Sequence, residues 1–512
     1  MGPLLHIVYF ALKYISLVSI VNKIKTQPVF LLLIPVFFVL HGFLYFFGFI
    51  APAEAALLAL FYCTGALLLY LLVWLLYRRQ WQKASIVTAY LLMAYFFFGA
   101  YHDFFLRHLP VLSHYSVLLL LIVTVFAILI LFLRKAKKLL QLVAWLNLLF
   151  IAYILVDIVL LMGNYIHPPA GKFSFLKEHS ITYKPVPAIN KPDIYFLVFD
   201  EYASSISLKE NYGYRNDIDS LLVQRGFRVL PESYSNYNYT PASIASILNM
   251  NYISGLADSV LLTAKDMNEC LGLIKYSQVL SFLSGQGYEI VNCSHFNLMN
   301  SPVTVNDPIL PVKTGLISDN TLYSKIKRDV WGDMNRDLLL DRLPWMKNAP
   351  DQNNRQLLKM IKDQSAKKNT HPVFVFGHLY MPHDPFWYDN KNQIRDPQQR
   401  ANDIASPATP YLAYLTHVNL EMKMLLDTIQ QHTNRKAVII VMGDHGFRGR
   451  DIDQNLRKNY QNLNAVYIPG KNNQLFYDSI SGVNQFRVVF NTLFNQSIPL
   501  QKDSMIFLNG KE

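Results

Sequence analysis

Charged residues are scarce in this sequence. Asp, Glu, Lys and Arg together make up 16% of the 512 residues, whereas hydrophobic residues make up 52% and the mean hydropathy is +0.19. Such a chain is too apolar to be disordered or purely soluble, and its composition is too varied for a fibrous protein. The composition therefore predicts a membrane protein.

Cysteine is also rare, and the 3 cysteines form no Cys-x-x-Cys pair, which excludes the usual cysteine-based zinc and redox motifs. Cys63 lies in a long apolar run. Cys270 and Cys293 lie in the C-terminal part and, if that part is exported, they can form one disulfide. Two buried free thiols are the alternative, and the sequence leaves both open.

Acidic residues are rarest in the N-terminal third. Residues 1–165 contain 11 basic residues (Lys and Arg) and 3 acidic residues. The remainder of the chain contains 36 basic and 32 acidic residues. The basic excess falls between apolar runs rather than on a soluble face, so we expect no binding of nucleic acid.

Five apolar runs fill this third of the chain. Each has about the 20 residues that a membrane-spanning helix needs. We therefore predict a five-helix transmembrane bundle over residues 1–163, with spans at about 28–51, 55–77, 84–102, 112–133 and 139–162.

Basic clusters orient these spans. Residues 78–83 follow the second run, residues 134–138 follow the fourth, and both loops are rich in Lys and Arg, whereas the alternate loops are not. By the positive-inside rule both clusters face the cytoplasm. The N-terminus is then cytoplasmic, and everything after the fifth span is predicted to lie outside.

A proline-rich stretch at 164–192 predicts a linker to an exported domain at 193–512. Three short apolar runs in that domain are typical of strands buried on both faces, and helical patterns such as 411–431 lie between them. We predict an α/β domain with a central, mostly parallel sheet flanked by helices.

Each of these runs ends in polar groups. The first ends in Asp200-Glu201, the second in Gly377-His378, and the third in Gly443-Asp444-His445-Gly446. Ligand crevices lie at the carboxyl ends of strands in such sheets, so these groups should converge. Carboxylate and imidazole ligands suit a divalent metal such as zinc or manganese; the alternative is that the acidic residues only cap helices.

Thr240 begins a helical pattern, TPASIASILN, with Pro241 in its first turn. Thr240 is compatible with a plain N-cap. It is also compatible with a nucleophile, because a helix N-terminus presents free N–H groups and a positive dipole end to a phosphate or sulfate. His383, which lies between two prolines, either orders a turn or contacts substrate.

Four segments in this order, KPDIYFLVFDEYASS, SNYNYTPASIASILN, GHLYMPHDPF and AVIIVMGDHGF, resemble the alkaline phosphatase and sulfatase superfamily over about residues 190–500. Five spans before such a domain further resemble the bacterial envelope transferases, namely lipoteichoic acid synthase and the lipid A phosphoethanolamine transferases. The resemblance implies a sulfatase-like domain on the outer side of a bacterial inner membrane, in the periplasm or outside the cell.

The resemblance also implies roles for named residues. It implies Thr240 as nucleophile and metal ligand beside Glu201, Asp444 and His445, with Asp200 as an additional or alternative ligand. It implies His383 near the substrate. His378 and Arg448 are further candidates for substrate contact, and Arg448 is equally compatible with a solvated basic residue.

Two features depart from the family pattern. Neither exported cysteine lies in a Cys-x-Pro-x-Arg motif, which disfavours sulfatase chemistry based on formylglycine. No histidine occurs at 446–465, where many two-metal relatives have one. We therefore expect one tightly held divalent ion, zinc or manganese, with a second, weakly held ion left open.

The function implied is transfer of a phosphoethanolamine or phosphoglycerol headgroup from a phospholipid donor to an envelope glycan or lipid acceptor, through a phosphothreonine. One alternative is a membrane-tethered phosphodiesterase or sulfatase-like hydrolase that uses water. Another is a catalytically silent receptor or scaffold, which the intact set of matched ligand positions disfavours.

Overall fold

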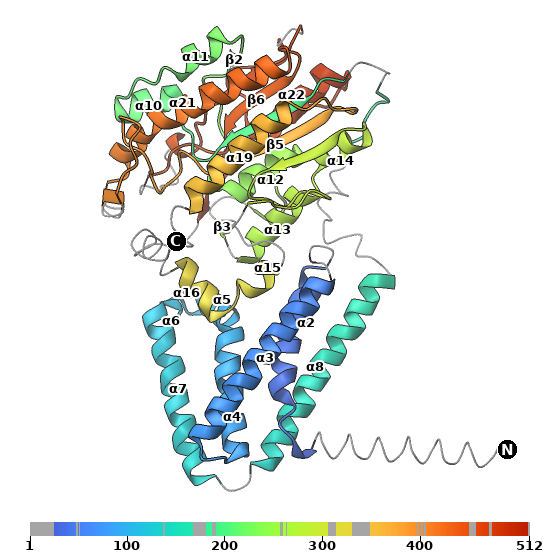
Figure 1. Cartoon of the computed structure of the whole chain (residues 1–512), viewed down its shortest axis with the longest axis vertical. Helices are drawn as coiled ribbons and strands as arrows, with labels where there is room; N and C mark the ends of the chain where they lie inside the picture. Colours follow the sequence, from blue (N-terminus) through green and yellow to red (C-terminus); the bar gives the residue numbers. More distant parts are fainter. Residues whose placement is uncertain are drawn as a thin grey trace, which may run out of the picture. The chain divides into compact units, whose positions relative to one another are not determined.

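The computed structural model describes residues 25–47, 50, 52–136, 139–166, 181–186, 191–256, 260–262, 264–305, 314–329, 349–396, 399–400, 403, 406–449, 457–470 and 474–509. The chain forms two compact units (Figure 1). The first, here called the helical unit, contains Met1–Ala170 and Lys313–Asp333. The second, the catalytic unit, contains Gly171–Val312 and Met334–Glu512. Most of the predicted linker at 164–192 lies outside the described residues.

Apolar helices make up most of the helical unit. They are α2 (Phe30–Tyr45), α3 (Pro52–Leu76), α4 (Trp81–Phe96), α5 (Phe98–His108), α6 (Pro110–Ser113), α7 (Tyr115–Lys135) and α8 (Leu140–Ile166). Leucine and alanine dominate α3, which begins with a proline and has Glu54 in its first turn, as favourable helix starts do.

Three of these helices, α3, α7 and α8, are long and apolar enough to cross a membrane. A fourth span is complete only if α4 and the first part of α5 are taken together, and these two helices are bent by 58°. Within the described residues, the prediction of five spans is therefore confirmed only for three or four. The helix α2 has 16 residues, and at about 1.5 Å per residue it is shorter than the roughly 30 Å hydrocarbon core.

A segment from the C-terminal part of the sequence also belongs to the helical unit. It contains α15 (Gly315–Ser318) and α16 (Leu322–Asp329), which follow the fourth strand of the catalytic unit in the chain. The backbone N–H of Gly99 donates to the carbonyl of Asn320 (2.9 Å), and the Lys325 ammonium pairs with the Asp103 carboxylate (3.1 Å). The sequence did not indicate that residues 313–333 belong to the helical unit.

The catalytic unit is built on a six-stranded sheet in the order β2-β7-β6-β1-β5-β4. Strands β4, β5, β1 and β6 are parallel neighbours, whereas β7 is antiparallel to both β6 and β2. The sheet is therefore mixed, with a parallel centre as predicted. Its strands are β1 (Ile194–Phe199), β2 (Arg228–Val229), β4 (Glu289–Cys293), β5 (Val373–Leu379), β6 (Val438–Gly443) and β7 (Asn464–Tyr467).

Helices cover both faces of the sheet, which confirms the predicted α/β fold. Alternate side chains of β1 enter opposite cores: Phe196 packs with one and Leu197 with the other. The Phe196 core includes α12 (Thr240–Asn249), α13 (Ala264–Lys275), α14 (Gln278–Gly285) and α22 (Gly482–Phe494). The Leu197 core includes α10 (Ser205–Tyr212), α11 (Ile218–Gln224), α19 (Ala349–Ser365) and α21 (Ala408–His432).

Smaller elements complete the unit. A two-stranded sheet pairs β3 (Val260–Leu261) with β8 (Leu508–Asn509), and a short 3-10 helix, η2, spans Arg457–Asn459. Cys270 and Cys293 are free and buried, so of the two alternatives left open by the sequence the structure has the pair of free thiols.

Candidate active site

The carboxyl ends of the three central strands lie side by side. Phe199, the last residue of β1, is in register with Leu379 of β5 and with Gly443 of β6. Asp200 and Asp444 follow β1 and β6 directly, so both acidic residues come to one edge of the sheet. This convergence follows from the parallel pairing, as expected from the strand-end pattern.

Asp200, Asp444 and His445 form a buried group at this edge. Each contributes a potential ligand atom, and these atoms lie within 4.8 Å of one another. The Oγ1 atom of Thr240 lies 3.4 Å from Oδ1 of Asp200 and 3.3 Å from Nε2 of His445. One hydroxyl, one imidazole and two carboxylates thus converge from α12, β1 and β6.

The backbone orients the imidazole of His445. Its Nδ1 lies 2.9 Å from the carbonyl of Gly446, which can only accept a hydrogen bond. Nδ1 therefore carries the proton, and Nε2 presents its lone pair to Thr240 and Asp200. Burial lowers the pKa of His445 to about 3, which keeps the ring neutral, as a metal ligand must be.

The buried carboxylates of Asp200 and Asp444 repel each other when both are charged. Burial, and then the nearby Asp444 carboxylate, raise the pKa of Asp200 well above its ordinary value. Oδ2 of Asp444 is buried and has no hydrogen-bond partner among the described residues. An orphaned carboxylate oxygen beside a second buried carboxylate fits a divalent cation, and oxygen and imidazole donors suit zinc or manganese.

Glu201 is placed differently from Asp200. It has a left-handed backbone (φ 63°), and its N–H donates to Oδ1 of Asp444 (2.8 Å). Its carboxylate Oε1 accepts from the backbone N–H and the Nε of Arg448, at 3.1 and 3.4 Å. Of the two acidic residues after β1, Asp200 lies in the converging group and Glu201 lies with Arg448.

The two glycines of the Gly-Asp-His-Gly segment are required by close packing. A Cβ at Gly443 would lie 2.3 Å from the carbonyl oxygen of Tyr202, and one at Gly446 would lie 2.0 Å from that of Lys458. Backbone atoms cannot move aside as a flexible side chain can. The glycines thus allow neighbouring chain segments to hold Asp444 and His445 in place.

Thr240 is the first residue of α12, and the N-cap position belongs to Tyr239, with no side-chain capping bond in the described structure. The Thr240 hydroxyl instead faces Asp200 and His445. One turn later, Ser243 donates to the carbonyl of Asp444 (2.5 Å), which ties the start of α12 to the end of β6. The interpretation of Thr240 as an N-cap is therefore wrong.

The remaining candidates surround this group. Nε2 of His383 lies 3.9 Å from Oε2 of Glu201, and its side chain keeps 17% of its surface exposed. His378 is buried on β5, with Nε2 3.9 Å from Oδ2 of Asp200. Arg448 is buried too, with its guanidinium 5.0 Å above the Tyr239 ring, so it is not the solvated residue considered as an alternative.

The pKa values of the two histidines are shifted in opposite directions. Burial lowers the pKa of His378 to about 3. Burial also disfavours charge on His383, but Tyr380, Asp384 and then Glu201 outweigh it and raise its pKa well above its ordinary value. Of the two, His383 is therefore the one suited to carry a proton at neutral pH.

Two supporting residues were missed from the sequence. His295 is buried just after β4, its ring 6.2 Å from that of His378, and it repeats the pattern of a strand that ends in a polar group. The sequence IVNCSH at 290–295 shows this pattern, and His295 could have been found from it. Tyr411 donates to the carbonyl of Glu201 (2.9 Å) and accepts from the N–H of Ala203 (3.1 Å), but no local pattern marks it.

Residues 212–480 match the model of the sulfatase family, and this range is more than half of the chain. The chain belongs to the sulfatase family. The match includes Thr240, His383, Asp444 and His445, and β1 with Asp200 and Glu201 lies just before it. The family lies in the superfamily that the four sequence segments resemble, so that resemblance is confirmed.

Solved structures similar to this sulfatase-family chain include the C-terminal periplasmic domain of EcEptC from Escherichia coli, at 14% identity and a TM-score of 0.39, with 62% of this chain and 85% of that one covered. They also include the phosphonate monoester hydrolase SpPMH from Silicibacter pomeroyi, at 12% identity and a TM-score of 0.38, with 62% and 76% covered. No curated protein matches the chain.

Proposed function

We propose that this chain is a membrane-anchored, metal-dependent transferase that moves a phospho-headgroup from a phospholipid to an acceptor hydroxyl through a phosphothreonine on Thr240. One observation carries the proposal. The Thr240 hydroxyl lies at the N-terminus of α12, within 3.4 Å of both Asp200 and His445. A hydroxyl so placed has acidic and imidazole groups on one side and the positive end of the helix dipole beside it.

Asp200, Asp444, His445 and Thr240 are the residues that would hold the divalent ion. When bound, the ion supplies positive charge that lowers the pKa of the Thr240 hydroxyl and stabilises phosphoryl oxygens. Glu201 neutralises Arg448 and, through its backbone N–H, orients Asp444. Arg448 in turn donates to the carbonyl of Asn238 (3.2 Å), two residues before Thr240, and so helps to position the hydroxyl.

The first step is attack of Thr240 Oγ1 on the donor phosphorus. The Thr240 hydroxyl gives its proton to the carboxylate of Asp200, 3.4 Å away. An O–P bond to threonine forms as the P–O bond to the lipid glycerol breaks, and diacylglycerol leaves with a proton on its oxygen. His383 Nε2 is placed to donate that proton, because it lies at the partly exposed side of the site and its pKa is raised. In the second step an acceptor hydroxyl gives its proton to His383 and attacks the phosphothreonine. The P–O bond to threonine breaks, and Thr240 takes back its proton from Asp200.

The donor headgroup in this proposal is phosphoethanolamine or phosphoglycerol, and the acceptor is an envelope glycan or lipid. The apolar helices have a physical role in such a reaction. They keep the site near a donor that stays in the bilayer and so raise its effective concentration. The proposal places the catalytic unit outside the cytoplasm, on the periplasmic or extracellular side of a bacterial inner membrane.

The test uses the full-length protein in vesicles of phosphatidylethanolamine and phosphatidylglycerol, with zinc or manganese added. Mass spectrometry of the peptide that contains Thr240 should find the added mass of one headgroup phosphate. Thr240→Ala should form no adduct. Ser246→Ala is the matched control, because Ser246 is buried on the same helix and its hydroxyl donates to the backbone carbonyl of Ser243 (2.7 Å).

Two results would contradict this proposal. Release of diacylglycerol by Thr240→Ala at the wild-type rate would exclude the covalent step. Accumulation of free headgroup phosphate, with none on an added acceptor, would identify a hydrolase that uses water.

A further inference from the structure

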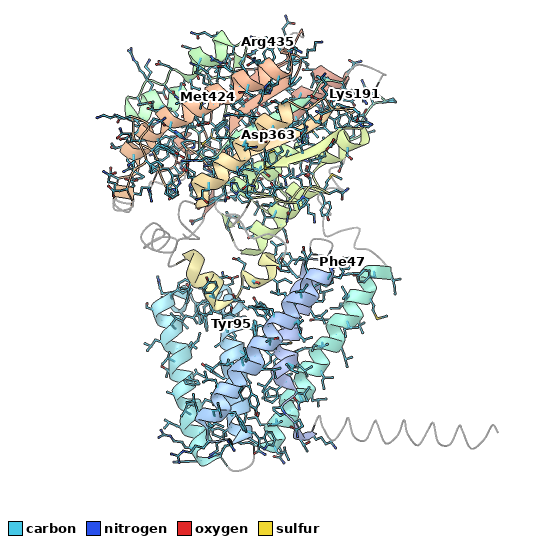
Figure 2. The ribbon with its side chains drawn as sticks, in the orientation of Figure 1. Phe47, Tyr95, Lys191, Asp363, Met424 and Arg435 are labelled. Carbon is cyan, nitrogen blue, oxygen red and sulfur yellow. The ribbon has the colours of Figure 1, made fainter. Side chains whose placement is uncertain are left out.

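The helical unit contains a groove between α3, α4 and α7. It has a volume of about 630 Å³, within the roughly 300–1,000 Å³ typical of small-molecule pockets. Aliphatic and aromatic side chains line it, and the polar side chains among them are three tyrosines: Tyr62, Tyr90 and Tyr95. Tyr95, on α4, is labelled in Figure 2. The Tyr90 hydroxyl donates to the carbonyl of Ile122 (2.6 Å), so it is already satisfied.

Small residues create the hollow. Gly65 and Ala66 lie on the groove side of α3, and a Cβ added at Gly65 would meet nothing within 4 Å. At the other end of these helices, Val73, Ala84 and Leu133 bury one another in a cluster that brings α3, α4 and α7 together. This cluster packs the three helices together beside the groove.

The segment with α15 and α16 covers the opposite end. Leu322 of α16 lines the groove, and the Tyr62 hydroxyl donates to Oγ of Ser318 (2.9 Å). Lys325 is buried and paired with Asp103, and its carbonyl accepts from Tyr115 (3.5 Å). The segment thus brings the hydroxyls of Tyr62 and Ser318 together beside an otherwise apolar groove.

The surroundings identify the occupant. Both α3 and α7 are candidate membrane spans, and only 11% of the most apolar window of each is buried in the protein. The groove therefore opens onto hydrocarbon, where water is not available to fill it. We infer that it binds an acyl chain of a membrane phospholipid, with the glycerol end beside Ser318 and Leu322. That this lipid is the donor of the transfer reaction rests on the proposed function.

The test measures lipid contact rather than catalysis. The full-length protein is placed in vesicles of phosphatidylethanolamine and phosphatidylglycerol that contain a phosphatidylethanolamine with a photoreactive group in its acyl chain. After illumination, peptides of α3, α4, α7 and α16 should carry more label than the exposed face of α8. Gly65→Trp fills the groove and should reduce label in these four helices by about tenfold, the equivalent of about 1.4 kcal/mol.

Gly163→Trp is the matched control, because Gly163 lies on another span, α8, and also has nothing within 4 Å of an added Cβ. It should leave the label in the groove unchanged. Gly65→Leu, a smaller change, should give an intermediate reduction and guards against misfolding of the tryptophan variant. Equal labelling of Gly65→Trp and wild type, or equal labelling of the groove and α8, would overturn the inference.

The same samples separate this inference from the transfer reaction. Thr240→Ala should lose headgroup transfer but keep the label in the groove. If wild type transfers no headgroup but Gly65→Trp still removes the label, the groove is a lipid site and the proposed function is wrong. If Gly65→Trp removes the label but leaves transfer unchanged, the bound lipid is not the donor.

Discussion

The hydroxyl of Thr240 lies 3.3 Å from Nε2 of His445, although the two residues are 205 positions apart in the chain. Thr240 is brought there by the start of α12 and His445 by the loop after β6. Because Nδ1 of His445 is held by the carbonyl of Gly446, its other nitrogen is free to face the threonine. The contact defines where the proposed chemistry takes place.

Loss of the Thr240 oxygen should abolish transfer without unfolding the protein. We expect Thr240→Ala to reduce diacylglycerol release by about three orders of magnitude or more, because an activated nucleophile is lost. Thr240→Ser should keep part of the activity, since it retains an oxygen but has a less restricted rotamer. Rates per folded protein measure this, and activity of the alanine variant within about tenfold of wild type would rule out the covalent mechanism.

Asp444→Asn should remove the metal. The wild type should bind one zinc or manganese per chain, whereas this variant lacks one of the two buried charges that require a cation. Without metal, the variant should be no less stable than wild type, because repulsion with Asp200 is relieved. Elemental analysis measures the bound metal, and thermal unfolding measures the stability. Asp427→Asn is the control, because Asp427 is half-exposed and forms an ion pair with Arg225 away from the site. Stoichiometric metal in Asp444→Asn would count against this site.

Gly446→Ala should destabilise the catalytic unit. Its Cβ would lie 2.0 Å from the carbonyl oxygen of Lys458, so the backbone must shift, at a cost of about 1–3 kcal/mol. Gly285→Ala, where nothing lies within 4 Å, should leave the Tm unchanged or raise it slightly. Thermal unfolding of the full-length protein compares the two variants. Equal Tm values would show that the backbone at Gly446 is not tightly packed against the carbonyl of Lys458.

Acid should destabilise the protein partly through His295. Burial lowers the pKa of His295 from 6.5 to about 4, so between these values the unfolded chain binds a proton that the folded protein does not. Stability should therefore fall as the pH falls from 6.5 to 4, by up to about 3 kcal/mol for this residue. In His295→Leu the loss of Tm between pH 7 and 4.5 should be smaller. An unchanged loss would exclude His295 as its source.

Membrane orientation is tested by reporter fusions. Fusions at residue 164 and in the loop at 134–138 should report opposite sides, with the loop in the cytoplasm, because that loop carries a basic cluster. The same side for both fusions would contradict the orientation. A fusion at 78–83 is the internal control and should agree with the loop at 134–138.

Much of the catalytic unit could be predicted from local patterns. Buried parallel strands need continuous apolar runs, and their carboxyl ends meet at one edge. Asp200, His378 and Asp444 could therefore be assigned to that edge from the sequence alone. The same reasoning applied to 289–295 would have included His295. Apolar length likewise identified α3, α7 and α8 as candidate spans, but it did not reveal the short α2 or the bend between α4 and α5.

Only the tertiary structure decided which group each side chain faces. The sequence could not separate Asp200 from Glu201, because the direction of Glu201 depends on a left-handed backbone held by Asp444 and Tyr411, 243 and 210 residues away. Likewise, Lys325 of α16 pairs with Asp103 of α5, 222 residues away. Periodicity reports which face of an element is buried, whereas the partner of a polar side chain is chosen by contacts between distant segments, which no local pattern contains.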